Sequence, residues 1–109
     1  MERLVKGDVV VVPYPAFDLK SSKKRPALVI AVSPVGAILC PITTKNLAKT
    51  ALIPIKSSDF SSGGLKLDSF ALPFWLSTFK FSHILYKAAA LKHEKFNEIL
   101  DKLCNFLRS

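Results

Sequence analysis

GDVVVVPYP, at residues 7–15, and RPALVIAV, at residues 25–32, are the stretches that decide the fold. The β-branched residues 9–12 favour a buried strand. Prolines offer no backbone donor to a strand ladder, so we expect the PYP that follows to end this strand. Residues 27–32 are again apolar and β-branched, and they are predicted to form the second strand.

The second stretch opens an uncharged segment that runs from residue 27 to residue 44. A membrane span must be considered for so long a segment, but SPVG at residues 33–36 breaks it and Pro41 interrupts it again. Two buried strands, the second at residues 37–43, joined by a turn explain the segment better. The N-terminus also lacks the apolar stretch of a secretory signal, so we expect a cytoplasmic protein.

The rest of the chain is expected to add an exposed loop and several short strands. The polar residues 16–24 lack periodicity and are predicted to form a loop that carries Asp18, Lys20, Lys23 and Lys24. Pro54 predicts a short or edge strand at 51–55, and turn residues predict a hairpin connection at 57–64. Apolar and polar residues alternate imperfectly at 65–72, which predicts a half-buried strand, and a further strand is expected at 79–86.

From residue 92 the apolar period becomes that of a helix. Glu98 and Lys102 lie on the polar face at the spacing of a favourable ion pair. The apolar stripe comprises Phe96, Ile99, Leu100, Leu103, Phe106 and Leu107. These patterns together predict a mostly β fold in a single domain over residues 1–109, with a small curled antiparallel sheet and a C-terminal α-helix packed on it.

The charge balance predicts a polyanionic partner. Sixteen Lys and Arg stand against eight Asp and Glu, a formal net charge of +8 in 109 residues. Nucleic acid is the leading candidate and an anionic membrane the second, although a charge run taken alone more often marks a solvated face. Cys40 and Cys104 match no metal-ligand or redox spacing, and we expect both to be reduced, structural thiols.

Several motifs, in order and spacing, closely resemble those of the MazF/PemK-like toxins. They are GDVVVVPYP at residues 7–15, SSKKRPALVI at 21–30, CPITTK at 40–45 and GGLKLDS at 63–69. Each motif alone is weak, but the ordered set spans nearly the whole chain. The resemblance therefore carries more information than any single motif.

This resemblance implies a small SH3-like barrel with added helices, forming a homodimer. It also implies the toxin of a type II toxin-antitoxin system, an endoribonuclease that cleaves single-stranded RNA at selected sequences and is covered by a cognate antitoxin. The arginine before proline and the threonine after isoleucine carry the chemistry in that family, and they map onto Arg25 and Thr43. Neighbouring residues that we expect to contact RNA are Lys20, Ser21, Lys23, Lys24, Thr44 and Lys45.

These two residue types suit RNA cleavage without a metal or other cofactor. RNA carries its own nucleophile, the 2′-hydroxyl, so a site must orient that group and stabilise the extra charge on phosphorus. Arg25 can place a planar fork of donors on two phosphate oxygens, and Thr43 can add a hydroxyl. A guanidinium stays charged and is a poor base, so the proton acceptor is not assigned. His83 and His93 lie far from Arg25 in the chain, and structural or surface roles are favoured for both.

An aromatic cluster follows the last motif. Trp75 is its one plausible platform for stacking on an unpaired base, and core or interface roles are favoured for the others. The cluster comprises Phe70, Phe74, Trp75, Phe79 and Phe81.

The chain departs from the family just after the Asp-Ser motif. Many relatives carry Arg-x-Asp there, whereas this chain has Leu72 and Phe74 at the two charged positions. An alternative therefore stays open: a catalytically degenerate module that binds nucleic acid or a protein such as a topoisomerase. Membrane association through the basic residues has little support, because no helix combines a basic face with exposed apolar bulk.

Overall fold

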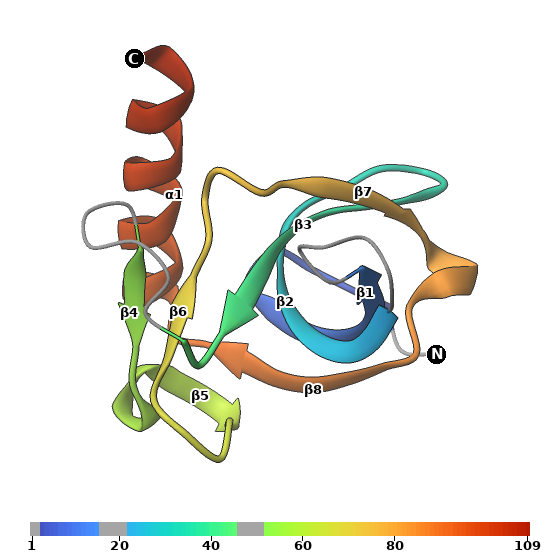
Figure 1. The fold of residues 1–109 in the computed structure, drawn as a ribbon, viewed down its shortest axis with the longest axis horizontal. Helices are drawn as coiled ribbons and strands as arrows, with labels where there is room; N and C mark the ends of the chain where they lie inside the picture. Colours follow the sequence, from blue (N-terminus) through green and yellow to red (C-terminus); the bar gives the residue numbers. More distant parts are fainter. Residues whose placement is uncertain (1–2, 16–21, 46–51) are drawn as a thin grey trace.

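The chain folds into a curled antiparallel sheet with a helix at its C-terminal end (Figure 1). The computed structural model describes residues 3–15, 22–45 and 52–109. Its strands are β1 (Asp8–Pro15), β2 (Ser22–Val32), β3 (Gly36–Thr43), β4 (Ile53–Ile55), β5 (Phe60–Gly63), β6 (Ser69–Ala71), β7 (Ser77–Lys80) and β8 (Tyr86–Leu91). Short 3-10 helices span Ser57–Asp59 and Phe81–His83, and the α-helix α1 spans His93–Arg108.

Strand β3 has different partners along its length. Strands pair in the order β4-β6-β3-β2-β1-β8-β5, and β7 pairs with the first half of β3. The second half of β3 leaves β7 and pairs with β6 at Ile42 and Thr43. Figure 1 shows β2 and β3 bending around β1 to form a half-barrel, with α1 packed beside it. The fold predicted from the sequence, mostly β with a C-terminal α-helix, is confirmed.

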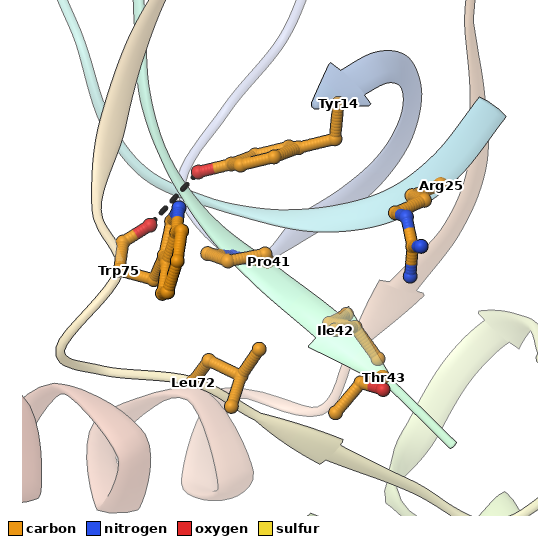
Figure 2. A pocket seen from close by; sticks show the side chains of 7 residues that line it. All are labelled: Tyr14, Arg25, Pro41, Ile42, Thr43, Leu72 and Trp75. Atoms are coloured by element: carbon orange, nitrogen blue, oxygen red, sulfur yellow. Dashed lines mark hydrogen bonds between the residues drawn. The ribbon is translucent and has the colours of Figure 1, made fainter. Parts of the chain in front are cut away.

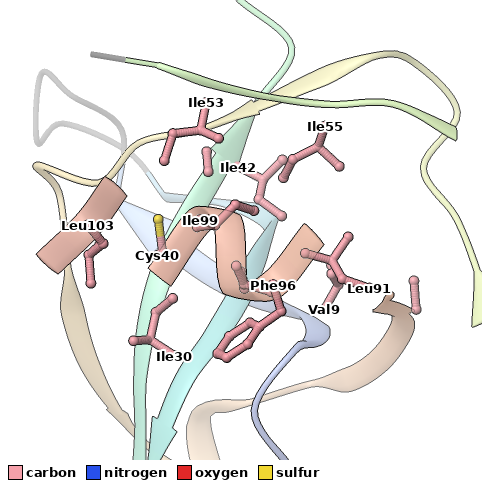
Figure 3. Close-up of a cluster of buried hydrophobic side chains, with 13 residues drawn as sticks. Val9, Ile30, Cys40, Ile42, Ile53, Ile55, Leu91, Phe96, Ile99 and Leu103 are labelled. Carbon is pink, nitrogen blue, oxygen red and sulfur yellow. The ribbon is translucent and has the colours of Figure 1, made fainter. Parts of the chain in front are cut away.

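Both faces of the central strands are buried, which explains why residues 27–44 carry no charge. Successive side chains of a strand point to opposite faces, so they alternate between two clusters. The cluster shown in Figure 3, on the side of α1, takes Val9, Leu28, Cys40 and Ile42 from these strands. The cluster inside the half-barrel takes Val10, Val12, Tyr14, Ala27, Val29, Ala37 and Leu39.

The helix buries only the first part of its predicted apolar stripe. Phe96, Ile99 and Leu103 are buried against the sheet, whereas Phe106 and Leu107 are 44% and 61% exposed. The predicted ion pair between Glu98 and Lys102 is present on the outer face, with a nitrogen–oxygen distance of 3.5 Å. Within the described residues, no helix has the length and apolar character needed to cross a membrane.

Gly7 and Asp8 fix the start of β1. Gly7 has φ +92°, a conformation that glycine adopts readily, and its N–H donates to the carbonyl oxygen of Val29 at 3.0 Å. The buried carboxylate of Asp8 accepts the N–H of Val5 at 2.9 Å and lies 3.2 Å from Nζ of Lys87. The Gly-Asp pair therefore ties β1 to β2 and β8.

The predicted end of the first strand is wrong, because β1 continues through Pro13 and Pro15. Its pairing with β8 covers only Asp8 to Val11, and beyond Val11 its described partner is β2 alone. An edge of a strand that makes no ladder bonds tolerates proline, since no donor is needed there. The pairing with β2 therefore carries the strand past both prolines.

The predicted loop before the second strand is also partly wrong. β2 begins at Ser22, so Lys23 and Lys24 lie in a strand paired with β1. Polar residues in this stretch show no apolar alternation, and only the pairing with β1 makes them a strand. The remainder of that loop, with Asp18 and Lys20, lies outside the described residues.

Several later boundaries also differ from the predicted ones, because strand pairing decides them. The predicted connection at 57–64 contains β5, and the predicted strand at 65–72 is reduced to β6. The strand predicted at 79–86 is wrong, because β7 and β8 lie on either side of a 3-10 helix there. The alanine-rich β8 is a strand because β1 and β5 pair with its two edges. β4 lies at the edge of the sheet, as predicted.

Candidate functional site

Arg25 and Thr43 come from neighbouring strands and share one face of the sheet. Ala27 of β2 pairs with Pro41 of β3, and Arg25 and Thr43 lie two residues beyond this pair on their respective strands. Side chains two residues apart point to the same face, so both residues point to the face of Ala27 and Pro41. Figure 2 shows the guanidinium of Arg25 directed toward the end of β3, where Thr43 lies.

An open groove surrounds these two residues and encloses about 300 Å³. We call it the basic groove. Its lining residues are Lys23, Lys24, Arg25, Pro26, Ile42, Thr43, Thr44, Lys45 and Ser69. The fold therefore brings together Lys23, Lys24, Arg25, Thr43, Thr44 and Lys45, all of them site residues predicted from the sequence. The predicted contacts Lys20 and Ser21 lie outside the described residues.

The electrostatics of the basic groove suit a polyanion. Lys23, Lys24 and Lys45 are exposed, and no acidic side chain is among the described residues that line the groove. Positive charges without a nearby carboxylate attract phosphates without competition from an internal partner. The described residues contain no group of three or more His, Cys, Asp or Glu placed to hold a metal ion.

Arg25 has an unsatisfied donor. The residue is half-buried, and its Nε is buried with no hydrogen-bond partner in the described part of the chain. A buried donor that lacks a partner costs free energy, about 1 to 3 kcal/mol. Because Arg25 lines the basic groove, a shift of its guanidinium toward a bound oxygen-rich ligand would relieve this cost. Arg25 is therefore prepared to bind an anion.

Thr43 is 6% exposed, and a short turn fixes its hydroxyl. Its Oγ1 accepts the backbone N–H of Lys45 at 3.1 Å. The bond occupies an acceptor position of the hydroxyl, so the hydroxyl hydrogen can still be donated to a ligand. Nearby, buried Ser69 donates from its Oγ to the carbonyl oxygen of Leu67 at 2.9 Å.

A second hollow adjoins the basic groove and shares Arg25 and Thr43 with it (Figure 2). We call it the aromatic recess. The full set of its lining residues is Tyr14, Arg25, Pro41, Ile42, Thr43, Leu72 and Trp75. Its free space is close to that needed by a single water molecule. A large ligand therefore cannot enter the recess and can contact only the residues at its opening.

Trp75, the predicted stacking platform, lines the aromatic recess together with the two predicted catalytic residues. Tyr14 and Leu72 were not predicted as site residues, and neither was Ser69 of the basic groove. Tyr14 and Ser69 lie within the quoted motifs, which was the available signal. Leu72 is 1% exposed and contributes an apolar side chain to the lining of the recess.

The hydroxyl of Tyr14 connects β1 to the segment that carries Trp75. It donates to the carbonyl oxygen of Trp75 at 2.8 Å (Figure 2). Burial raises the pKa of Tyr14 above its usual value, against a smaller lowering by the side chain of Ser77. The phenol therefore stays a neutral donor at ordinary pH.

Other predicted groups lie elsewhere. His83 and His93 are exposed and line neither hollow, which agrees with a surface role. Cys40 and Cys104 are free thiols, as predicted. Of the aromatic cluster, Trp75 and Phe79 pack partly against the inner core, while Phe74 is 38% exposed.

Comparison with protein families matches residues 5–107 to PemK-like, MazF-like toxins of type II toxin-antitoxin systems. The chain belongs to this family. The resemblance inferred from the motifs is thereby confirmed, and the basic groove is a feature of a MazF-like toxin domain. No curated protein sequence matches the chain.

Solved MazF structures share the fold. An endoribonuclease in complex with its cognate antitoxin, from a mycobacterial species, is 13% identical with a TM-score of 0.73, over 98% of this chain and 95% of that one. Mycobacterium tuberculosis toxin MazF-mt6 is 14% identical with a TM-score of 0.72, over 93% and 96%. Deinococcus radiodurans MazF is 17% identical with a TM-score of 0.73, over 95% and 96%. At these identities the comparison establishes a shared fold.

Proposed function

We propose that this MazF-like toxin is an endoribonuclease that cleaves single-stranded RNA without a metal or other cofactor. The observation that carries the proposal is the buried Nε of Arg25, which has no hydrogen-bond partner among the described residues. It lies on the same sheet face as the hydroxyl of Thr43, in a groove lined by lysines. A guanidinium, a hydroxyl and flanking ammonium groups are the donors that a phosphodiester needs.

The reaction uses the nucleophile of the RNA. The 2′-oxygen attacks phosphorus, the bond from phosphorus to the 5′-oxygen breaks, and the products are a 2′,3′-cyclic phosphate and a 5′-hydroxyl. The 2′-hydroxyl loses its proton to a base, and the leaving 5′-oxygen gains one. Arg25 stabilises the extra negative charge on the phosphate oxygens, and Thr43 donates to the same group. Both residues donate hydrogen bonds to the phosphate from fixed positions, so they need to move little during the reaction.

Binding follows from the charges and from Trp75. Lys23, Lys24 and Lys45 contact the backbone phosphates, together with Thr44 and the flanking residues 20–21. The indole of Trp75 stacks on an unpaired base next to the scissile phosphate, a contact worth about 1 to 3 kcal/mol. An unpaired base is available only in single-stranded RNA. The site therefore selects against duplex.

Family membership also supports the proposed partners. One solved relative of the same fold is described as an endoribonuclease in complex with its cognate antitoxin. We expect this chain to form a homodimer in the cytoplasm and to bind an antitoxin of its own. An antitoxin segment that covers the basic groove would carry acidic side chains, because the groove presents lysines.

The test is cleavage of a long single-stranded RNA in EDTA, followed by mapping of the fragment ends. The wild type should cut at discrete sites and leave 5′-hydroxyl ends. Arg25→Ala should lose about a hundredfold or more in rate. Arg25→Lys should also cleave slowly, because lysine keeps the charge but cannot form the bidentate hydrogen bonds of a guanidinium. Arg108→Ala, at the exposed end of α1, is the matched control and should cut normally.

Two results would contradict the proposal. Undiminished cutting by Arg25→Ala would remove this residue from the mechanism. Intact RNA after incubation with folded wild type would remove the enzymatic function itself.

Buried Leu72 favours a second candidate, a module that binds without cleaving. Leu72 is apolar and 1% exposed, so no charge enters the aromatic recess from its position. Such a module would bind RNA, or a protein such as a topoisomerase, through the basic groove. It would leave RNA intact in the cleavage assay. A topoisomerase poison would arrest growth with damaged DNA and whole messenger RNA, whereas the nuclease would leave cut messenger RNA.

A further inference from the structure

We propose that Tyr14 is a positioning residue of the RNA site, which holds Trp75 at a fixed place in the aromatic recess through the hydrogen bond of its hydroxyl. The proposal rests on the proposed function, because it assigns Trp75 to a base of the bound RNA. Tyr14 does not contact the reacting atoms in this assignment and acts through Trp75.

Trp75 lies in a segment that makes few regular backbone bonds. Residues 72–76 connect β6 to β7 and belong to no strand or helix. The N–H of Leu72 donates to the carbonyl oxygen of Pro41 at 3.0 Å, and the N–H of Trp75 donates to the carbonyl oxygen of Leu72 at 3.2 Å. The Tyr14 hydroxyl then anchors the carbonyl of Trp75 at 2.8 Å. The segment is thus tied to β3 at one end and to β1 at the other.

Tyr14 is itself held rigidly. It is 2% exposed in the inner core cluster, and its ring lies 5.3 Å from that of Phe79, centroid to centroid, at an interplanar angle of 45°. Tilted aromatic pairs at this distance are attractive. The ring would hold this place without its hydroxyl. Loss of the hydroxyl alone would therefore remove the bond to Trp75 and leave the ring in the core.

The same pair of strands places Arg25. Val12 of β1 pairs with Arg25 of β2, and Tyr14 follows Val12 by two residues, so Tyr14 and Arg25 point to the same face. The pairing of β1 with β2 therefore places both the guanidinium of Arg25 and the ring of Tyr14. A change in that pairing would move both groups together.

The first experiment uses the protein without RNA. Trp75 is the only tryptophan of the chain, so its fluorescence, excited where tyrosine does not absorb, reports on this one side chain. Tyr14→Phe keeps the ring and removes only the hydroxyl. It should shift the emission of Trp75 and increase quenching by acrylamide. Tyr86→Phe removes the hydroxyl of the other tyrosine, 53% exposed on β8, and should change neither.

The second experiment separates binding from chemistry. Tyr14→Phe should raise KM for single-stranded RNA about fivefold, the factor that one ordinary hydrogen bond is worth, and leave kcat near the wild-type value. Binding of 2′-O-methyl RNA, whose nucleophile is blocked, should weaken by the same factor. In a Trp75→Ala background, Tyr14→Phe should have no further effect on RNA binding, because the indole through which it acts is absent.

The outcomes are distinct. Unchanged Trp75 fluorescence in Tyr14→Phe, or an equal loss of RNA affinity with and without Trp75, would overturn the positioning role. Tyr14→Phe that also lowers kcat at saturating RNA would show a role in chemistry and would overturn it as well. If the wild type binds 2′-O-methyl RNA but cuts no RNA, the nuclease proposal fails while the fluorescence and binding measurements still decide the role of Tyr14.

Discussion

The hydroxyl oxygen of Thr43 accepts a hydrogen bond from the backbone N–H of Lys45 at 3.1 Å. The bond holds the side chain at the end of β3 and leaves the hydroxyl hydrogen for a ligand. It also fixes the backbone that leads from Thr43 to Thr44 and Lys45, both of which line the basic groove. One short turn thus orients a candidate catalytic donor and two candidate RNA contacts.

Thr43→Val should lower RNA cleavage about a hundredfold, because it replaces the hydroxyl by a methyl group of similar shape and removes a donor to the phosphate. Thr43→Ser keeps the hydroxyl and should retain most of the rate. Single-turnover cleavage at saturating RNA measures both. Equal rates for the two variants would show that the hydroxyl has no part in catalysis.

Replacement of Lys23, Lys24 or Lys45 by alanine should weaken RNA binding and its dependence on salt. For single strands, loss of one phosphate contact lowers the slope of log K against log salt concentration by about 0.7. Titrations of single-stranded RNA at several salt concentrations give the slope. Lys102→Ala removes a lysine paired with Glu98 on α1 and serves as the control. A slope that stays unchanged in all three groove variants would place the RNA elsewhere.

The protein should lose stability as the pH rises above about 9. Burial raises the pKa of the Cys40 thiol from 9.0 to about 12. Between these two pH values the thiol loses its proton in the unfolded chain and keeps it in the folded chain. The free energy of unfolding then falls by about 1.4 kcal/mol per pH unit, and the stability is fully present below pH 9. Above pH 10 the raised pKa of Tyr14 acts in the same direction.

Urea unfolding between pH 8 and pH 10 measures this dependence. Cys40→Ala should flatten it, whereas Cys104→Ala, which keeps Cys40, should retain it. A steep alkaline loss that persists in Cys40→Ala would assign it to other groups.

The two ends of α1 should respond differently to truncation. Ile99 is 0% exposed in the core beneath the helix, and Ile99→Ala should cost about 2 to 5 kcal/mol because it leaves a cavity. Leu107 is 61% exposed, and Leu107→Ala should cost less than about 0.5 kcal/mol. Unfolding midpoints in urea compare the two. A large loss in Leu107→Ala would mean that the end of the helix is covered in solution.

Local patterns were sufficient for the elements whose signals are strong. The apolar runs around Val9 and Val29 predicted buried strands, and the period of Phe96, Ile99 and Leu103 predicted the helix. The motifs around Arg25 and Thr43 predicted which residues would gather in one groove. Those signals depend on residues close together in the chain, so they can be read without knowledge of the fold.

Long-range pairing decided the elements that were missed. Lys23 and Lys24 became part of a strand because β1 pairs with them past Pro13, and the alanine-rich β8 became one between β1 and β5. Such segments form strands because a neighbouring strand pairs with them, and not because their residues prefer the β conformation. No local pattern reports a partner many residues away.

The sequence by itself determined a basic, mostly β chain of the MazF/PemK type with a C-terminal helix, and it singled out Arg25 and Thr43 as candidates for the chemistry. Only the tertiary structure decided that the hydroxyl of Tyr14 bonds to the backbone of Trp75, 61 residues away, and that Leu72 lines the same recess as Arg25. The physical reason for this division is that charge, hydropathy and motifs are read from residues that are close together along the chain. A hydrogen bond between β1 and the segment after β6 exists only once the sheet has curled and brought them together.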